Sequence, residues 1–280
     1  MLILPGRVYE RVAMYRNQLR VVLSVLALAR ENEIGLTAAG IGYHLLNSLL
    51  PLSVFLVVGF SATGRLSMVT TAIGAVMGID ATGVLSSLDR VLRDEAGRRR
   101  AVVIAGVLLV WSSVTLVRAI NAAFGAVYNV RQKRSRTRTI IDTVVVCPIL
   151  LGGVPLCLGT VLWVTVIADV GSERLFTVAL VFLTLLGAFL PMYYRFPGDQ
   201  VTVREAMPGA VFASTSWVAV AVGLGVYAST SETVRLYGIT GGVMLLLTSL
   251  YLCGLTLLLG AIVNAVLTGH VEVDSEWTPL

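Results

Sequence analysis

Six long apolar stretches dominate the sequence, and charged or turn-forming residues separate them. They cover residues 36–60, 101–127, 144–168, 175–194, 209–227 and 242–267. A helix rises about 1.5 Å per residue, so about 20 mostly apolar residues are needed to cross the hydrocarbon layer of a bilayer. All six stretches approach or exceed this length. The pattern therefore predicts an all-α, polytopic membrane bundle of six transmembrane helices.

Two further segments are helical in pattern but are poor candidates for crossing. Residues 8–31 contain an apolar run over 21–29 that is too short to span, and Arg11, Arg16, Arg20 and Arg30 surround it. This pattern is typical of an amphipathic helix on the membrane surface. Residues 66–88 are moderately apolar but contain Asp80 and several Ser and Thr residues. We expect them to form one or two amphipathic helices outside the membrane.

These assignments predict one membrane domain over residues 1–280. An amphipathic cytoplasmic helix occupies 1–35, the transmembrane bundle 36–268 and a cytoplasmic tail 269–280. An extracytoplasmic helical loop covers 61–100 within the bundle. The start of the chain lacks the apolar core of a cleavable signal peptide, so we expect the first span to direct insertion itself.

Composition supports a membrane protein and argues against common kinds of enzyme site. Hydrophobic residues make up 56% of the chain, charged residues make up 13%, and the mean hydropathy is +0.87. The three cysteines lie in apolar runs, where they resemble small hydrophobic residues more than a disulfide framework. The two histidines lack metal-site spacing, and no nucleophile-elbow motif occurs. We therefore predict no catalytic residues, no metal and no cofactor.

Basic residues predict the orientation, because short cytoplasmic loops retain them. With an internal N-terminus, the inner segments carry 12 Lys and Arg residues and the outer segments carry eight. The triplet Arg98, Arg99 and Arg100 opposes this orientation. The densest basic run nevertheless lies in the short loop after the second span. We expect a multi-pass protein of the cell membrane with both termini in the cytoplasm.

That loop contains a membrane-surface basic cluster, which consists of Arg131, Lys133, Arg134, Arg136 and Arg138. The net charge of +5 and the pI of 9.4 also fit a nucleic-acid-binding protein. A basic run beside a transmembrane helix is the ordinary product of topology, and it attracts anionic lipid headgroups. The predicted partners are therefore the lipid bilayer and its anionic headgroups, and not nucleic acid.

Polar side chains within the spans mark candidate substrate contacts, because hydrocarbon penalises them unless they face the bundle interior. In the first span Tyr43, His44 and Asn47 lie on one helical side, just before Pro51. Pro51 removes a backbone hydrogen bond and is expected to kink the helix. His44 has two interpretations, a hydrogen-bonded packing residue or a proton carrier.

Arg118 gives the second span its sharpest signal. It follows a three-and-four spacing with Thr115 and Asn121, about two and a half turns before Val127. One interpretation is that the guanidinium binds an anionic or amphiphilic substrate or pairs with Asp142. The other is that the side chain extends to the cytoplasmic headgroups.

Asn264 completes the set of candidate substrate-binding residues, and it is either an interhelical hydrogen-bond donor or a lining residue. A nearby GxxxG pattern runs from Gly238 to Gly242. Such small-residue pairs often mark close helix packing, so we expect close packing here.

Segments spread along the chain together resemble the YihY/BrkB family of multi-pass inner-membrane proteins. They are GYHLLNSLLPL at 42–52, WSSVTLVRAINAAFGAVYNV at 111–130, YYRFPGDQVTVREAMPGAV at 193–211, and YGITGG at 237–242, which leads to YLCGLTLLLGAIVNA at 251–265. The chain departs from the family pattern at Ile262, where many members have glutamate, and at Ser249, where tryptophan is usual.

The resemblance implies six spans and a cytoplasmic N-terminus. Members of the family were once labelled ribonuclease BN, and the family is associated with envelope resistance and suspected of moving lipids or solutes. If the family's glutamate is needed for proton coupling, this chain works without it.

Two hypotheses for function follow from the residues and from the resemblance. The first is a transporter or a translocator of a lipid or another amphiphile, because polar faces occur within the spans and prolines at 51, 148, 155 and 191 allow hinges. The second is a non-transporting scaffold for envelope or lipid assembly, with the basic loop as its docking surface. An intramembrane enzyme or nuclease is the least favoured alternative.

Overall fold

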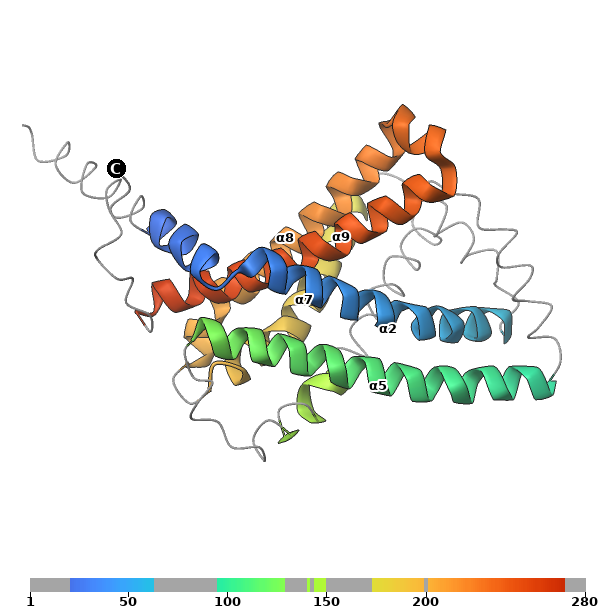
Figure 1. Ribbon diagram of the computed structural model, residues 1–280, viewed down its shortest axis with the longest axis horizontal. Helices are drawn as coiled ribbons and strands as arrows, with labels where there is room; N and C mark the ends of the chain where they lie inside the picture. The colour runs from blue at the N-terminus through green and yellow to red at the C-terminus, as the bar shows by residue number, and fades with distance from the viewer. Residues whose placement is uncertain are drawn as a thin grey trace, which may run out of the picture.

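The structure, a computed structural model, describes residues 21–62, 95–128, 140–141, 144–149, 173–198 and 201–269. Regular secondary structure within these residues is helical throughout, which confirms the predicted all-α class. Figure 1 labels the long helices, which are α2 (Ile34–Ala62), α5 (Glu95–Val127), α7 (Glu173–Arg195), α8 (Val203–Thr230) and α9 (Glu232–Leu267). A shorter helix over residues 21–31 precedes α2.

Each labelled helix contains a stretch that is long and apolar enough to cross a membrane. These five helices correspond to five of the six predicted spans. The remaining span, 144–168, is described only at 144–149, where it is helical. The count of six therefore stays a prediction. The amphipathic segment 66–88, the basic cluster, residues 1–20 and residues 270–280 lie outside the described residues.

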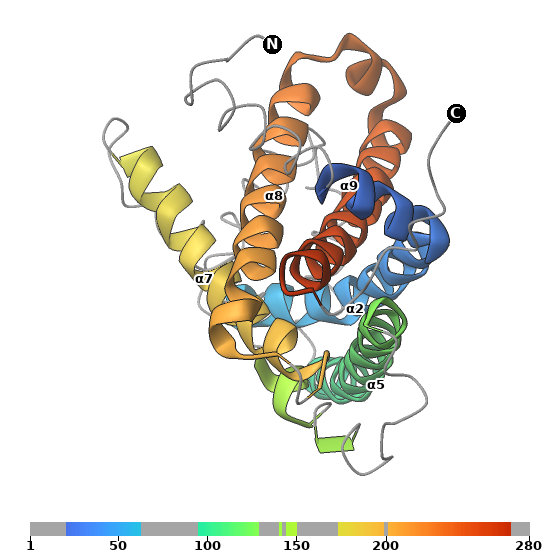
Figure 2. The ribbon, with the colours of Figure 1, turned by 90° about the vertical axis from the view of Figure 1, so that its left-hand side faces the viewer.

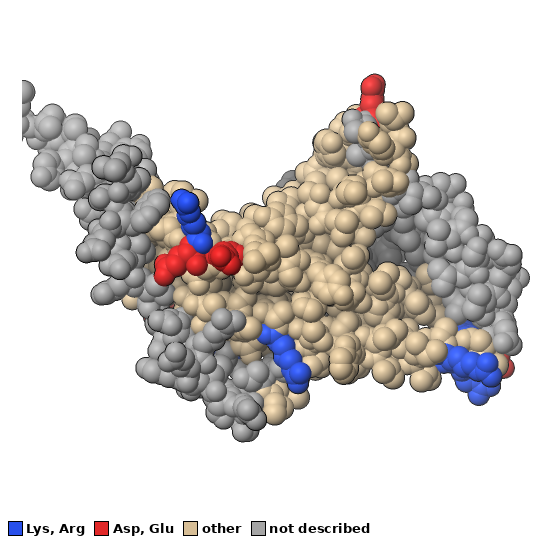
Figure 3. Space-filling view, viewed as in Figure 1, with Lys and Arg blue, Asp and Glu red and all other residues tan. Residues whose placement is uncertain are grey.

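The described helices expose large apolar side chains that water would penalise. Leu36, Trp111 and Leu236 are 73%, 75% and 82% exposed. Such surfaces are rare on soluble proteins and are typical of helices that contact lipid. Figure 3 shows a mostly uncharged face, with a basic patch where α5 begins. The arginines at 98, 99 and 100 are all exposed there.

Helix α9 is central to the bundle, because it packs against α2, α5 and α8. Half of its membrane-spanning stretch is buried, the largest share among the five described spans. Helix α5 lies antiparallel beside α2, and α7 packs on the side of α8 away from α9 (Figures 1 and 2). The main packing contacts of the described helices therefore run in the spatial order α5, α2, α9, α8 and α7.

Small residues let α2 and α9 approach each other closely. A methyl group on Gly254 of α9 would lie 2.7 Å from the carbonyl oxygen of Ala38. A methyl group on Gly42 of α2 would lie 3.3 Å from the backbone of Leu250. Helices in lipid gain no hydrophobic energy from associating, so close packing of this kind is a main source of their stability.

Helix α8 begins six residues before the predicted start at 209, because a capping box precedes its apolar part. The carboxylate of Glu205 accepts from the Thr202 backbone N–H at 2.7 Å, and the Thr202 hydroxyl accepts from the Glu205 backbone N–H at 3.4 Å. These bonds satisfy two N–H groups that a helix start otherwise leaves open.

Gly238 interrupts α9 near its start, with φ 53° and ψ −125°. This conformation corresponds to the first central position of a type II′ turn, where glycine is strongly preferred. A methyl group on Gly238 would meet nothing within 4 Å. The predicted close packing is therefore wrong at Gly238, because this glycine breaks the helix and an added methyl group would meet no other described part of the chain. Gly242, the other glycine of the pattern, is buried. Close contacts occur instead at Gly209, Gly254 and Gly260.

The short helix over 21–31 joins α2 through a sharp turn. Glu33 has φ 47°, and the side-chain amide of Asn32 donates to the carbonyl of Leu28 at 3.0 Å. Leu28 is only 3% exposed and belongs to the core, whereas Leu26 is 59% exposed. This helix therefore packs its inner side on the bundle and leaves an apolar side open.

Candidate functional site

The candidate residues of α2 lie on the half-exposed side of that helix. Tyr43 is 60% exposed, and His44 and Asn47 are half-buried. The rings of Tyr43 and His44 meet edge to face, with centroids 5.5 Å apart. The hydroxyl of Ser48 donates to the carbonyl of His44 at 3.0 Å. Helix α2 continues through Pro51 to Ala62.

On α5, some residues of the predicted polar side are buried in the core and others are exposed. Asn121 is 5% exposed, and Gly125 one turn later is also buried. Arg118 and Ala122 are exposed. Arg118 therefore points away from the core formed by the described residues, whereas Asn121 points into it.

The pairing of α2 with α5 brings the two sets of candidates to a similar depth. A methyl group on Gly106 of α5 would lie 3.6 Å from the ring of Phe55 on α2. In two antiparallel helices, residues lie at the same height when they are the same number of positions from such a contact, counted forward on one helix and backward on the other. Arg118 lies twelve residues after Gly106 on α5, and Tyr43 lies twelve residues before Phe55 on α2. Both residues therefore fall at roughly the same level of the bundle.

Asn264 lies elsewhere, in a buried junction where α8 meets α9. It is fully buried, its Oδ1 accepts from the Gly209 backbone N–H at 2.6 Å, and its Nδ2 donates to the Ala206 carbonyl at 3.1 Å. A methyl group on Gly209 would collide with the carbonyl oxygen of Gly260 and would lie 2.7 Å from Cγ of Asn264. The amide thus connects α9 to the backbone of α8.

Aromatic side chains extend this junction to α5 and α7. Tyr193 of α7 is fully buried, and its hydroxyl donates to the carbonyl of Leu257 on α9 at 2.6 Å. Its ring meets Phe124 of α5 edge to face at 5.1 Å, and Phe124 meets Phe196 at 5.6 Å. We call this set, with Gly209, Gly260 and Asn264, the four-helix junction. It joins the ends of α5, α7 and α9 to the start of α8.

Tyr128 directly follows α5 and lies beside the junction. Burial raises the pKa of its hydroxyl above the ordinary value for tyrosine, so the group stays neutral at physiological pH. Sequence patterns alone did not identify Tyr193, Gly209, Gly260 or Tyr128 as site residues. Tyr128 does follow the three-and-four spacing of Arg118 and Asn121 in the sequence. For Tyr193, Gly209 and Gly260 the available signal was their presence in the motifs of the family resemblance, because their contacts join distant parts of the chain.

The described residues contain no group of three or more His, Cys, Asp or Glu side chains that is able to hold a metal ion. The basic cluster at 131–138 and Asp142 fall outside the described residues, so the proposed lipid contact and ion pair stay predictions.

The sequence profile described as "Virulence factor BrkB" matches residues 25–278. Among curated proteins, the chain is 27% identical over 250 residues to UPF0761 membrane protein Mpe_A1422 of Methylibium petroleiphilum, which is 84% of this chain and 59% of that protein. It is 26% identical over 233 residues to UPF0761 membrane protein azo3165 of Azoarcus sp. (strain BH72), which is 73% of this chain and 57% of that protein.

A shorter match is to the ribonuclease-like protein YfkH of Bacillus subtilis (strain 168), at 35% identity over 95 residues. It covers 34% of each chain. This chain therefore spans less than two thirds of the length of the curated relatives that it matches. No solved structure matches it.

Proposed function

The chain belongs to the BrkB virulence factor family, and on that premise we propose that it is a transporter or a translocator of a lipid or another amphiphile. The observation that carries the proposal is the position of Arg118. A permanent cation within a membrane-spanning helix needs an anion, water or a headgroup. Arg118 is exposed, and by register it lies at the level of Tyr43 on the neighbouring helix.

In this proposal, Arg118 binds an anionic group of the substrate, and the polar atoms of Tyr43, His44 and Asn47 contact its neighbouring polar atoms. Asn121 supports α5 from the core side, where it is buried. Asn264 contributes through the arrangement of the helices, because both ends of its amide bind the backbone of α8. In this proposal the exposed side of Tyr43 and Arg118 faces lipid, which favours an amphiphilic substrate over a small ion.

The test uses purified protein in vesicles loaded with fluorescent anionic lipids or small anionic solutes, with and without ion gradients. Arg118→Ala should abolish the movement of the probe, and Arg118→Lys should retain part of it. Arg204→Ala is the matched control, because Arg204 is exposed at the start of α8, on a different helix from Arg118 and Tyr43. If the wild type moves no probe from a broad panel, the proposal fails. Equal loss in both alanine variants would also contradict it.

A second candidate function is a non-transporting scaffold, and the closed four-helix junction favours it. The junction is fully packed by Tyr193, Phe124 and Asn264, which suits a rigid support. A scaffold should retain protein partners when it is purified from native membranes under mild conditions. Purification without any stable partner would count against this function.

We further propose that the termini and the basic cluster are cytoplasmic.

We also propose that the protein is not an enzyme. The word ribonuclease in the name of YfkH belongs to that protein, which this chain matches over only 95 residues. An RNA-cleavage assay on purified protein, with and without divalent metal ions, tests this directly. Cleavage that co-purifies with the protein and survives chromatography would overturn it.

A further inference from the structure

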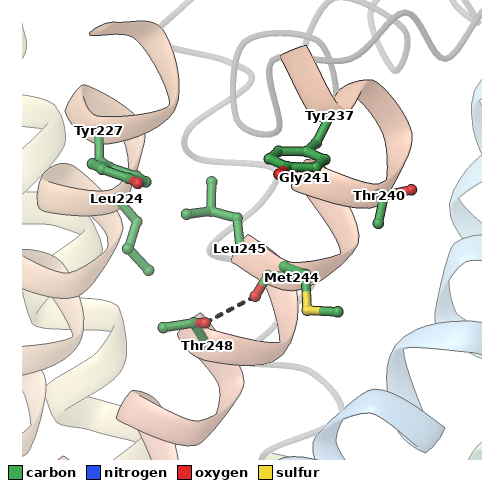
Figure 4. A pocket seen from close by; sticks show the side chains of 8 residues that line it. All are labelled: Leu224, Tyr227, Tyr237, Thr240, Gly241, Met244, Leu245 and Thr248. Atoms are coloured by element: carbon green, nitrogen blue, oxygen red, sulfur yellow. Dashed lines mark hydrogen bonds between the residues drawn. The ribbon is translucent and has the colours of Figure 1, made fainter. Parts of the chain in front are cut away.

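A groove of about 610 Å³ lies between the upper parts of α8 and α9, far from the four-helix junction. Figure 4 shows its walls. They include Leu224 and Tyr227 on α8, and Tyr237, Met244, Leu245 and Thr248 on α9. We call it the α8–α9 groove. Its volume lies in the range of sites that bind drug-sized molecules.

The groove exists because α8 and α9 separate along their length. At the junction, Gly209 and Gly260 bring the two backbones into contact. Further along, the helices are farther apart, and the Trp217 side chain lies between them. Its indole N–H donates to the carbonyl of Cys253 on α9 at 3.0 Å. Beyond Trp217, the break at Gly238 turns the first residues of α9 across the end of the pair, as Figure 2 shows. The helices remain apart there.

The lining of the groove is suited to hydrocarbon and not to water. None of the lining residues whose side chains the structure describes carries a charge. The hydroxyl of Thr248 donates to the carbonyl of Met244 at 2.9 Å, within its own helix, as the dashed line in Figure 4 marks. Apolar walls are better covered by hydrocarbon than by water, and an unfilled groove forfeits the dispersion contacts of its walls. A hydrocarbon group therefore fits this space best.

The groove is continuous with the surface that the two spans present to the bilayer. Met244 on its wall is 61% exposed, and Thr240 and Thr248 on the same wall are also exposed. Tyr227 and Tyr237 are 50% and 62% exposed at the end of the helix pair. Tyrosines concentrate at the membrane–water interface, so they indicate that this end lies near the headgroups.

We propose that the α8–α9 groove binds one acyl chain of a membrane lipid. The chain enters sideways from the bilayer and lies along Leu224, Met244 and Leu245, and the glycerol end of the lipid stays near the two tyrosines. Membrane lipids surround this surface in the proposed arrangement, so a lipid reaches the groove without passing through water. The proposal is independent of transport, because a lipid held in the groove does not have to cross the membrane.

The test reconstitutes the full chain in vesicles of phosphatidylglycerol and phosphatidylethanolamine that contain a photoreactive lipid with a diazirine on one acyl chain. Mass spectrometry then locates the adducts. Adducts should be enriched on the groove peptides around 224 and 244–248, relative to the equally lipid-exposed part of α5 around Val107, which is 66% exposed. No enrichment in the wild type would overturn the proposal, whether the groove is empty or another part of the chain fills it.

Two variants sharpen the result. Leu245→Trp and Leu224→Trp place an indole in the groove from opposite walls, and each should abolish the enrichment while the gel-filtration profile stays that of the wild type. Leu247→Trp is the matched control, because Leu247 is 41% exposed on α9 and does not line the groove. Loss of enrichment in this control, or its persistence in a folded groove variant, would contradict the proposal.

Discussion

Buried polar atoms in the four-helix junction depend on one another more than on local sequence. Asn264 binds backbone atoms 55 and 58 residues away, and Tyr193 binds a carbonyl 64 residues away. In hydrocarbon, each group without a partner is costly, and water is not available to replace a lost bond. Single side chains therefore decide how the ends of four helices meet.

Replacing Asn264 with alanine should lower stability by about 1–3 kcal/mol, because it leaves the Gly209 N–H without this buried acceptor. The measurement is the unfolding of purified protein in detergent, followed by heat or by a chemical denaturant. Thr256→Ala is the control on the same helix. Among the described residues, the Thr256 hydroxyl bonds within α9, to the carbonyl of Leu252 at 2.8 Å and that of Cys253 at 3.2 Å. An equal loss in both variants would show that the interhelical bond has no special weight.

Replacing Gly209 with alanine should also destabilise the fold, by about 1–3 kcal/mol, because the added methyl has no space. It would collide with Gly260 and lie 2.8 Å from the ring of Tyr193. The same substitution at Gly223 of α8 should be neutral or stabilising, because nothing lies within 4 Å and alanine favours helix. Thermal melts should therefore show a lower melting temperature for Gly209→Ala and an unchanged or higher one for Gly223→Ala. Similar shifts would contradict the close packing of α8 on α9.

At the level of elements, the apolar pattern predicts the helices well and their ends less well. Five predicted spans coincide with described helices because hydrophobic length is a direct consequence of bilayer thickness. The start of α8 is missed because Thr202 and Glu205 are polar, although the capping-box spacing is visible in the sequence. The role of Gly238 is missed because a GxxxG pattern does not distinguish close packing from a break.

The candidate site is less predictable than the helices, because helical spacing identifies a shared side but not what that side faces. Arg118 and Asn121 follow one spacing, yet one is exposed and the other is buried. Asn264 was identified from its polarity, but its partners come from another helix. These outcomes depend on how helices pack, and no local pattern contains that information.

The break in α9 gives a prediction at this scale. Gly238→Ala should cost about 1–3 kcal/mol, because a positive φ with ψ near −125° suits glycine alone, and no collision contributes. Gly225→Ala in α8 is the control, since Gly225 also has open space around it but a helical backbone. Melting temperatures in detergent distinguish the two. A Gly238 variant as stable as the wild type would mean that α9 tolerates a continuous helix here.

At the scale of the whole molecule, the packing of the helices assigns chain segments to two ends of one bundle. The end of α2, the start of α5 and the turn between α8 and α9 lie at one end. The start of α2, the end of α5 and the four-helix junction lie at the other. This assignment follows from contacts alone and does not depend on which end is cytoplasmic. Basic residues occur near both ends, so charge alone leaves the orientation as a proposal.

Cysteine labelling in intact cells tests the assignment and the orientation together. Glu95→Cys and Glu232→Cys replace exposed residues at one end, and Arg30→Cys and Arg204→Cys replace exposed residues at the other. A membrane-impermeant maleimide should label the first pair in intact cells and the second pair only after permeabilisation, if the junction end is cytoplasmic. The reverse pattern would overturn the proposed orientation but keep the fold. A split within either pair would contradict the fold itself, because helices packed as observed hold both members of a pair on the same side of the bilayer. The three native cysteines, 147, 157 and 253, lie in apolar runs of the sequence and should remain unlabelled in the parent chain, which supplies the background.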